Sequence, residues 1–237
     1  MSHNILFSID DVILSFKSLI EHKDFDRVPA VELADWLWKQ YEIPTSLFCF
    51  MHGYGIQLQS VPDDYAANFQ KRKRYLKLGF HSIDADTDYS ICNKERATYD
   101  YEKVINELLR ITGDNEDLIS RKIRVHNYHA SNEAIIGFRD AKCGIKELLT
   151  ADDNRISYDL DESDMSSINE LGIYENHENG LVYKKTDIRS EKYSIEQIIS
   201  ATKRKFISDI EIFTHEWALT DENIEKLKMA LAYISME

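Results

Sequence analysis

Glycine and proline are scarce in this 237-residue chain, which has eight glycines and three prolines. No stretch rich in glycine, serine or proline interrupts the sequence, so nothing in it marks a flexible linker between two folded parts. One hydrophobic core can serve a chain of this length. We therefore expect residues 1–237 to form a single domain.

Cysteine is also rare. Cys49, Cys92 and Cys143 stand far apart, and no pair has the C-x-x-C spacing of a metal-binding knuckle. This excludes a zinc ribbon and a disulfide framework, and it predicts three free thiols.

Long apolar runs are missing from the sequence. No eighteen consecutive apolar residues occur, and the N-terminus has no basic region followed by an apolar stretch. The sequence therefore predicts neither a transmembrane helix nor a signal peptide. We expect a cytoplasmic protein with no membrane partner.

Positive charge is in deficit, since 29 lysines and arginines face 42 aspartates and glutamates, for a net charge of −13. Nucleic acids and anionic membranes repel such a surface, so we expect no nucleic-acid partner. The basic run Lys71–Arg74 is the exception, and its position on an expected helix predicts a solvated helix face. The hydrophobic fraction of 43% indicates an ordinary globular protein.

Short β-rich runs alternate with segments of helical spacing along the whole chain, which predicts mostly parallel strands with helices outside. The expected strands are Ile5–Ile9, Thr45–Met51, Leu76–Ser82, Lys122–Tyr128, Glu147–Ala151, Leu181–Ile188 and Glu211–Thr214. The expected helices are Val31–Tyr41, Asp64–Leu76, Tyr101–Thr112, Glu133–Ala141, Ile195–Thr202 and Asp221–Ile234. The acidic stretch Asp152–Asp164 is expected to be a long loop.

Two adjacent carboxylates, Asp10 and Asp11, follow the first expected strand in the segment NILFSIDDVILSF. One reading is that one of them caps a helix beginning near Val12. The other is that the pair shares a site with a cation, because neighbouring buried charges repel each other.

Polar residues of catalytic type also follow other expected strands, and the ends of parallel strands converge at one edge. Each residue alone has a local explanation, but five strand ends bearing Asp or His exceed what capping requires. The polar residues at or near the ends of the expected strands are Asp10, Asp11, His81, Ser82, Arg124, His126, Tyr128, His129, Asp152, Asp153, His215 and Glu216.

Several familiar sites are excluded. Leu219 stands where a zincin helix starting at His215 needs a second histidine, and the sequence has no Walker A motif and no G-x-S-x-G elbow. The remaining set of carboxylates and histidines suits a divalent metal that activates water.

The sequence resembles the polysaccharide deacetylase family, the NodB-homology carbohydrate esterases. Phe7–Asp11 stands in the place of the family's T-F-D-D-G motif, and Phe80–Asp84 begins like its H-[ST]-x-x-H motif. Ile212–His215 is similar to its final Leu-x-His motif. The resemblance implies a distorted, TIM-like (β/α) barrel, expected to have seven or eight strands, with one divalent metal. Zinc is the first choice for a site rich in histidine.

The resemblance also implies roles for matched residues. Asp10 becomes the general base and His215 the general acid, while Asp11 and His81 become metal ligands. A metal-bound water needs a base beside it and the leaving amine needs a proton, so the four roles are chemically consistent.

The sequence departs from the family at two positions, since Val12 replaces a glycine and Ala85 replaces the second metal histidine. We choose Asp84 as the substitute ligand, because a helical turn would bring it near the face of His81. The alternatives Asp86, His126 and His129 stay open.

The segment Arg124–Tyr128 is a loose counterpart of the family's arginine-containing motif, and it suggests supporting roles. Arg124 is expected to orient Asp10, Asp153 to hold Arg124, and His126 to line the site.

We therefore expect a metal-dependent hydrolase that removes an N-acetyl or related acyl group from a sugar or glycan. The main alternative is a metal-free pseudoenzyme or glycan-binding protein on the same barrel. A glycoside hydrolase that uses Asp10 with Asp153, and a purely structural protein, are further alternatives.

Overall fold

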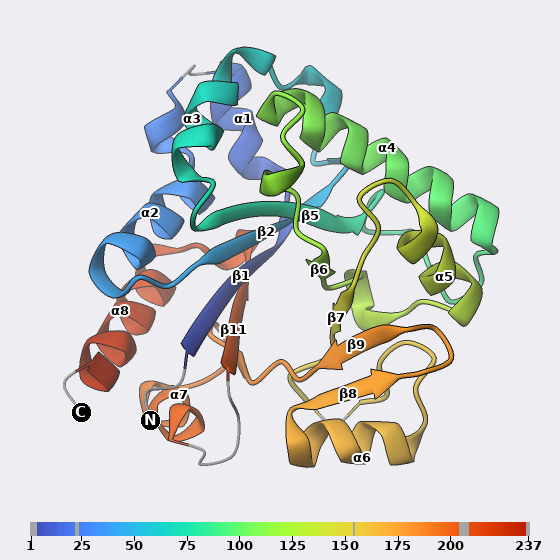
Figure 1. The fold of residues 1–237 in the computed structure, drawn as a ribbon. Helices are drawn as coiled ribbons and strands as arrows, with labels where there is room; N and C mark the ends of the chain where they lie inside the picture. The colour runs from blue at the N-terminus through green and yellow to red at the C-terminus, as the bar shows by residue number, and fades with distance from the viewer. Residues whose placement is uncertain (1–3, 22–23, 154, 204–208, 236–237) are drawn as a thin grey trace.

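Strands and helices alternate along the chain in the computed structural model, which describes residues 4–21, 24–153, 155–203 and 209–235 (Figure 1). The helices are α1 (Leu14–Glu21), α2 (Pro29–Tyr41), α3 (Ala66–Arg72), α4 (Lys94–Thr112), α5 (Asn132–Asp140), α6 (Glu162–Leu171), α7 (Ile195–Thr202) and α8 (Asp221–Ser235). The strands are β1 (Asn4–Val12), β2 (Thr45–Phe50), β3 (His52–Gly53), β4 (Ile56–Gln57), β5 (Leu76–Ser82), β6 (Lys122–Ile123), β7 (Glu147–Leu149), β8 (Ile173–Asn176), β9 (Leu181–Lys184), β10 (Ile188–Arg189) and β11 (Asp209–His215).

A five-stranded parallel sheet forms the centre of the molecule, in the order β10-β11-β1-β2-β5 (Figure 1). β1 and β11, from opposite ends of the chain, lie side by side in register, so that Asp10 is opposite His215. All five strands point the same way, and their carboxyl ends therefore meet at one edge of the sheet. This edge carries the predicted site residues of the first, third and last expected strands.

A second sheet has the order β6-β7-β9-β8, in which β8 runs antiparallel to β9. A single parallel bridge between Leu78 and Ile119 lies between the two sheets. The expected TIM-like barrel is therefore seen as two sheets, and within the described residues no continuous ladder joins them. β6 and β10 are only two residues long, which leaves few backbone groups to extend the pairing.

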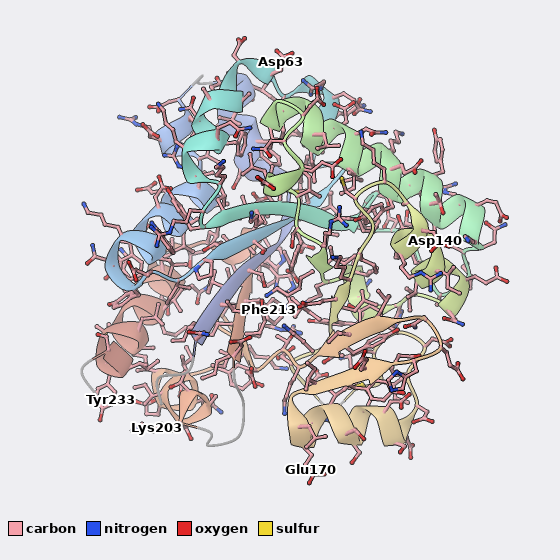
Figure 2. The ribbon with its side chains drawn as sticks, viewed as in Figure 1. Asp63, Asp140, Glu170, Lys203, Phe213 and Tyr233 are labelled. Carbon is pink, nitrogen blue, oxygen red and sulfur yellow. The ribbon has the colours of Figure 1, made fainter. Side chains whose placement is uncertain are left out.

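Apolar side chains fill the space between the strands and the surrounding helices. Phe213 on β11 is fully buried near the centre, whereas the labelled charged residues Asp63, Asp140, Glu170 and Lys203 lie at the periphery (Figure 2). Helix α2 begins at Pro29, two residues before the expected start at Val31, because proline suits the first helical turn. Its buried residues are Ala30, Val31, Leu33, Ala34 and Leu37.

The strand expected at Lys122–Tyr128 is wrong beyond Ile123. The backbone turns into a 3-10 helix at His126–Tyr128, where Asn127 and Tyr128 have φ values of 58° and 60°. Left-handed backbone cannot continue a strand. Arg124, His126 and Tyr128 consequently do not share one face of a strand.

Other expected boundaries also shift. Helix α4 begins at Lys94 rather than Tyr101, helix α3 ends at Arg72, and a break at residues 185–187 divides the expected strand Leu181–Ile188 into β9 and β10. Helix α6 and strand β8 were not expected, whereas α1 lies where the capping alternative placed a helix beginning near Val12. The described residues of the acidic stretch are irregular up to Asp161, which caps α6 through a capping box.

The basic run Lys71–Arg74 is only partly a solvated face. The Arg72 side chain is 12% exposed and binds Asp35, with Nη2 and Oδ2 2.6 Å apart. Arg74 lies over the ring of Trp38.

The three cysteines are free thiols, as predicted. Among the described residues, no helix has the length and apolar character needed to cross a membrane.

Candidate functional site

Asp10 and Asp11 lie inside β1 rather than after it. The pairing of β1 with β2 shifts between Ile9 and Val12, and Asp11 has a positive φ of 60°. This irregularity re-aims the two side chains at the carboxyl edge of the sheet. Neither aspartate caps α1, because the backbone N–H groups at its start donate to Glu216 instead.

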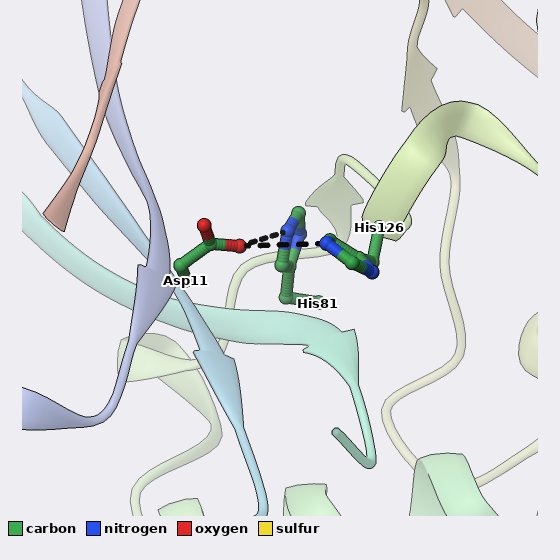
Figure 3. A group of neighbouring side chains, drawn as sticks. All are labelled: Asp11, His81 and His126. Carbon is green, nitrogen blue, oxygen red and sulfur yellow. Dashed lines mark hydrogen bonds and ion pairs between the residues drawn. The ribbon is translucent and has the colours of Figure 1, made fainter. Parts of the chain in front are cut away.

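Asp11, His81 and His126 form a compact group at this edge (Figure 3). Their ligand atoms all lie within 4.8 Å of one another. Oδ1 of Asp11 is 3.1 Å from Nε2 of His81 and 3.9 Å from Nε2 of His126. Two ligands of one ion, each about 2.0–2.2 Å from it, are separated by similar distances. The group therefore has the donor types and the spacing of a metal site.

Hydrogen bonds and burial shift the pKa values of Asp11 and His126 in this group. Nδ1 of His81 lies 2.5 Å from the carbonyl oxygen of Arg124, to which it donates, so Nε2 is turned toward Asp11. Burial and the charge of His81 lower the pKa of His126. Burial raises the pKa of Asp11, but its hydrogen bond with His81 and the three nearby histidines outweigh burial and lower that pKa to about 2. The ionised carboxylate of Asp11 and the neutral imidazole of His126, which these shifts favour, are the forms that bind metals.

Asp10 is buried and paired with Arg124. Nη1 of Arg124 donates to Oδ1 of Asp10 at 2.8 Å and to Oγ of Ser8 at 3.1 Å, while Nη2 donates to Thr186. The guanidinium also packs 4.1 Å from the ring centroid of Phe213. Arg124 is fully buried, so this network holds the Asp10 carboxylate in a fixed orientation.

His215 lies at the end of β11 and is paired with Glu191. Nδ1 of His215 and Oε1 of Glu191 are 2.6 Å apart, and the Glu191 carboxylate also accepts from Thr214. The indole of Trp217 stacks on His215 and donates from Nε1 to Oδ2 of Asp11 at 3.1 Å. Trp217 thus contacts both His215 of the Glu191–His215 pair and Asp11 of the possible metal ligands.

A pocket of about 80 Å³ opens beside these residues. Asp10, His81, Arg124, His126 and His215 all contribute to its wall. One water needs about 10–15 Å³ of such space, so the pocket fits a few waters or a small acyl group rather than a whole sugar ring. Any larger ligand must extend out of the pocket.

Two predicted residues lie apart from this arrangement. The Asp84 carboxylate accepts hydrogen bonds from Asp86 and Thr87 in its own turn and is not part of the Asp11 group. Asp153 binds Arg155 through both carboxylate oxygens, so it does not hold Arg124. The expected pairing of Asp153 with Arg124 is therefore wrong. His126, one of the open alternatives, occupies the place that we gave to Asp84.

Sequence reasoning missed Glu191 entirely and missed the contacts of Trp217 and Glu216. Glu191 follows β10, a strand of only two residues, which is too short to be recognised from an apolar run in the sequence. The only available signal was the position of Trp217 and Glu216 next to His215 at a strand end.

No known family profile matches the sequence, and no curated protein is similar to it in sequence. A family 4 acetyl xylan esterase from Clostridium thermocellum, solved in complex with a cobalt ion, is similar in structure, with a TM-score of 0.52 and 10% identity over 97% of this chain and 83% of that one. A mutant of a CE4 family pseudoenzyme with restored enzymatic activity has a TM-score of 0.50 and 10% identity, over 99% of this chain and 63% of that one. A 4-alpha-glucanotransferase from Thermococcus litoralis has a TM-score of 0.57 and 13% identity, over 99% of this chain and 37% of that one. At these identities the likeness shows the fold alone, an α/β architecture that this chain shares with these three proteins.

Proposed function

We propose that this protein is a metal-dependent hydrolase that removes an N-acetyl or related acyl group from a sugar or glycan. One observation carries the proposal: a single small pocket is lined by His81 and His126 of the Asp11 group, by Asp10 with its partner Arg124, and by His215, which is paired with Glu191. Deacylation needs an electrophile, a base and an acid close together, and these three units supply candidates for each.

Asp11, His81 and His126 would hold one divalent ion. Two imidazoles and one carboxylate are a common donor set for zinc and for other divalent first-row metals, and we keep zinc as the first choice. When bound, such an ion polarises the acyl carbonyl and lowers the pKa of a coordinated water. Asp84 is not needed in this proposal, because His126 supplies the third ligand.

Asp10 is proposed as the general base. Arg124 holds Oδ1 of its carboxylate, and Asp10 lines the pocket where a water would be deprotonated. Burial lowers the pKa of Arg124, but the neighbouring Asp10 charge outweighs it and raises that pKa, so the guanidinium stays charged. Because the guanidinium of Arg124 is permanently charged, it orients the Asp10 carboxylate and cannot accept the proton that Asp10 takes from water.

His215 is proposed as the general acid. Burial lowers its pKa, but the hydrogen bond with Glu191 and the charges of Asp10 and Asp11 outweigh burial and raise it above 6.5. The imidazolium is therefore available near neutral pH to protonate the departing amine. Glu191 holds Nδ1, which leaves Nε2 to carry the transferred proton.

We further propose that residues 1–237 form one domain and that the two sheets together represent one distorted (β/α) barrel. The order of the parallel strands supports this, because β1, β2 and β5 in one sheet are followed in the chain by β6, β7 and β9 in the other. The chain then returns through β10 and β11 to pair with β1.

The glycoside hydrolase alternative receives less support. It requires two available carboxylates on either side of a substrate, and the carboxylate proposed to act with Asp10, that of Asp153, is engaged by Arg155. The pseudoenzyme alternative differs from our proposal only in lacking a bound metal or turnover, and it is decided by experiment.

The test is elemental analysis of the purified chain by plasma mass spectrometry, with wild type, Asp11→Asn and His81→Ala dialysed identically. We expect near-stoichiometric metal in wild type and loss of metal in both variants. Asp84→Asn is the matched control and should keep the metal. Acetate release from N-acetylated oligosaccharides should then depend on the metal. If wild type takes up no zinc, cobalt or manganese, the hydrolase proposal fails; if it holds metal without releasing acetate from any acetylated sugar, the pseudoenzyme is favoured.

A further inference from the structure

The pocket beside the Asp11 cluster is unusually rich in arginine for a chain with a net charge of −13. Arg124, Arg155 and Arg189 all line it, and among the described residues Asp10 is the only carboxylate in the lining. Because Asp10 is paired with Arg124, their charges largely cancel. Arg155 and Arg189 are also paired, but their carboxylates lie outside the pocket lining, so in these two pairs only the arginine contributes to the wall.

The three arginines are arranged by depth. The side chain of Arg124 is 1% exposed, that of Arg189 is 19% exposed, and that of Arg155 is 49% exposed. Arg124 thus lies at the floor, and Arg155 lies at the mouth. If the acyl group of a substrate enters the pocket, the rest of the sugar stays outside. That part of the sugar would then lie near the guanidinium groups of Arg189 and Arg155.

Arg155 and Arg189 are each braced by an aspartate that does not line the pocket. Arg155 donates from Nε and Nη2 to Asp153, and Arg189 donates from the same two atoms to Asp152. In the part of the chain that the structure describes, Nη1 of neither arginine donates a hydrogen bond to protein. In each ion pair the carboxylate thus lies outside the pocket lining. The arginine lines the pocket and keeps guanidinium N–H groups that make no hydrogen bond to the described protein.

Ring contacts add to the bracing. Arg155 lies over Tyr128, with 5.7 Å from Cζ to the ring centroid, and Arg189 lies over Phe213 at 5.3 Å. Nη2 of Arg189 also reaches the hydroxyl of Tyr128 at 3.5 Å. A guanidinium with a carboxylate along one edge and a ring against its face loses little further freedom when it binds a ligand.

We propose that Arg155 and Arg189 form a subsite for an anionic group, a carboxylate or a phosphate, carried by the acylated sugar. This inference rests on the proposed function, since it gives that function a substrate class. Guanidinium groups with free donors match carboxylate and phosphate oxygens, and such charge-assisted hydrogen bonds are stronger than neutral ones. A purely structural role for the two ion pairs predicts, by contrast, no preference between neutral and anionic sugars.

The experiment is a ligand titration of the full chain after removal of metal by a chelator, so that phosphate cannot bind a metal ion. The probes are N-acetylglucosamine, N-acetylmuramic acid and N-acetylglucosamine 6-phosphate, which carry no charge, a carboxylate and a phosphate. We expect at least one anionic probe to bind about tenfold or more tightly than the neutral sugar. Added salt should weaken this preference.

Two variants test the residues. Arg155→Gln removes a half-exposed side chain. Asp152→Asn combined with Arg189→Gln removes both charges of the second pair, so that the buried Asp152 carboxylate is not left without its cation. Both should reduce the anionic preference about tenfold and leave binding of the neutral sugar unchanged. Arg27→Gln, at a side chain that is 84% exposed and outside the pocket lining, is the control and should behave as wild type.

The outcomes separate this inference from the proposed function. Equal binding of neutral and anionic probes, no binding of either anionic probe, or an unchanged preference in both arginine variants would overturn the anionic subsite, whatever the chain hydrolyses. A chain that prefers an anion through these arginines but hydrolyses no acylated sugar would support the subsite and contradict the hydrolase. The stronger of the two anionic probes identifies the source of the charge as carboxylate or phosphate.

Discussion

Glu191 and His215 meet from two adjacent parallel strand ends, with Oε1 and Nδ1 2.6 Å apart. Burial raises the pKa of Glu191, but the hydrogen bond and the charge of His215 outweigh it and lower that pKa below 4.5. The pKa of His215 shifts the other way, above 6.5. Each residue therefore stabilises the charged form of its partner.

Glu191→Gln should narrow the pH range of activity. Without the carboxylate, the pKa of His215 falls, so the alkaline decline of kcat in the metal-loaded protein should begin at lower pH. A profile of acetate release against pH measures this, and Glu196→Gln, on the surface of α7, is the control. An unchanged alkaline limb would contradict the role of His215 as the acid.

The same variant should alter stability in a defined pH range. The raised pKa of His215 contributes stability that is complete below pH 6.5 and is lost as pH rises through the folded-state pKa. The lowered pKa of Glu191 contributes stability above pH 4.5 that is lost as pH falls through its folded-state pKa. Urea unfolding should therefore show the largest cost, about 1–3 kcal/mol, between these values and less at high pH.

Glu216 stabilises the start of helix α1, and Glu216→Gln should destabilise the fold. Its carboxylate accepts from the backbone N–H groups of Ile13, Leu14 and Ser15 at 2.6–2.8 Å, using both oxygens. Glutamine keeps one oxygen and turns an amide donor toward the other N–H groups. We expect a loss of about 1–3 kcal/mol in the free energy of unfolding by urea. Glu222→Gln, on an exposed turn of α8, should cost much less; equal costs would contradict this capping role.

Asp10 and Arg124 should show strong coupling in a double-mutant cycle. Arg124→Met leaves the Asp10 carboxylate buried without its cation, which should cost about 3–5 kcal/mol of stability. Asp10→Asn combined with Arg124→Met removes both charges and should be more stable than Arg124→Met alone. Urea unfolding of the four proteins gives the coupling free energy. Additive effects would show that the ion pair does not hold Asp10.

Local patterns predicted the framework of the fold well where buried strands were long. The strands near Asp10, His81 and His215 are buried runs of seven to nine residues, and all three belong to the central sheet, as the alternation of strands and helices predicts. Because these strands are parallel, their ends meet, and the residues chosen at those ends lie at one site. The sequence therefore located Asp10, Asp11, His81 and His215 together.

Short elements and left-handed turns could not be predicted from local sequence patterns. The choice between Asp84 and His126 depended on where the expected strand Lys122–Tyr128 ends: it stops at Ile123, and His126 begins a 3-10 turn with its Nε2 3.9 Å from Asp11. The spacing of hydrophobic residues in the sequence does not indicate that turn. Glu191 and Glu216 act on partners 24 and about 200 positions away, and pattern reasoning cannot see such pairings before the sheet order is known.

Trp217→Phe should weaken metal binding without unfolding the protein. The indole donates from Nε1 to Oδ2 of Asp11, so Oδ1 is left to face His81 and His126, and phenylalanine keeps a ring against His215 but has no donor. Partners that orient a ligating carboxylate typically change metal affinity by about 10–100-fold, and we expect a loss near the lower figure because Trp217 is 56% exposed.

Competition with a chelating dye measures that affinity, and the melting temperature should stay within about 2 °C of wild type, since a surface ring is exchanged for another. Trp36→Phe removes an indole that packs on Tyr41, away from the Asp11 cluster, and should leave metal affinity unchanged. Equal affinities for wild type and Trp217→Phe would mean that Asp11 keeps its orientation without the indole. The contacts of Asp11 with the two histidines would then be sufficient to define the site.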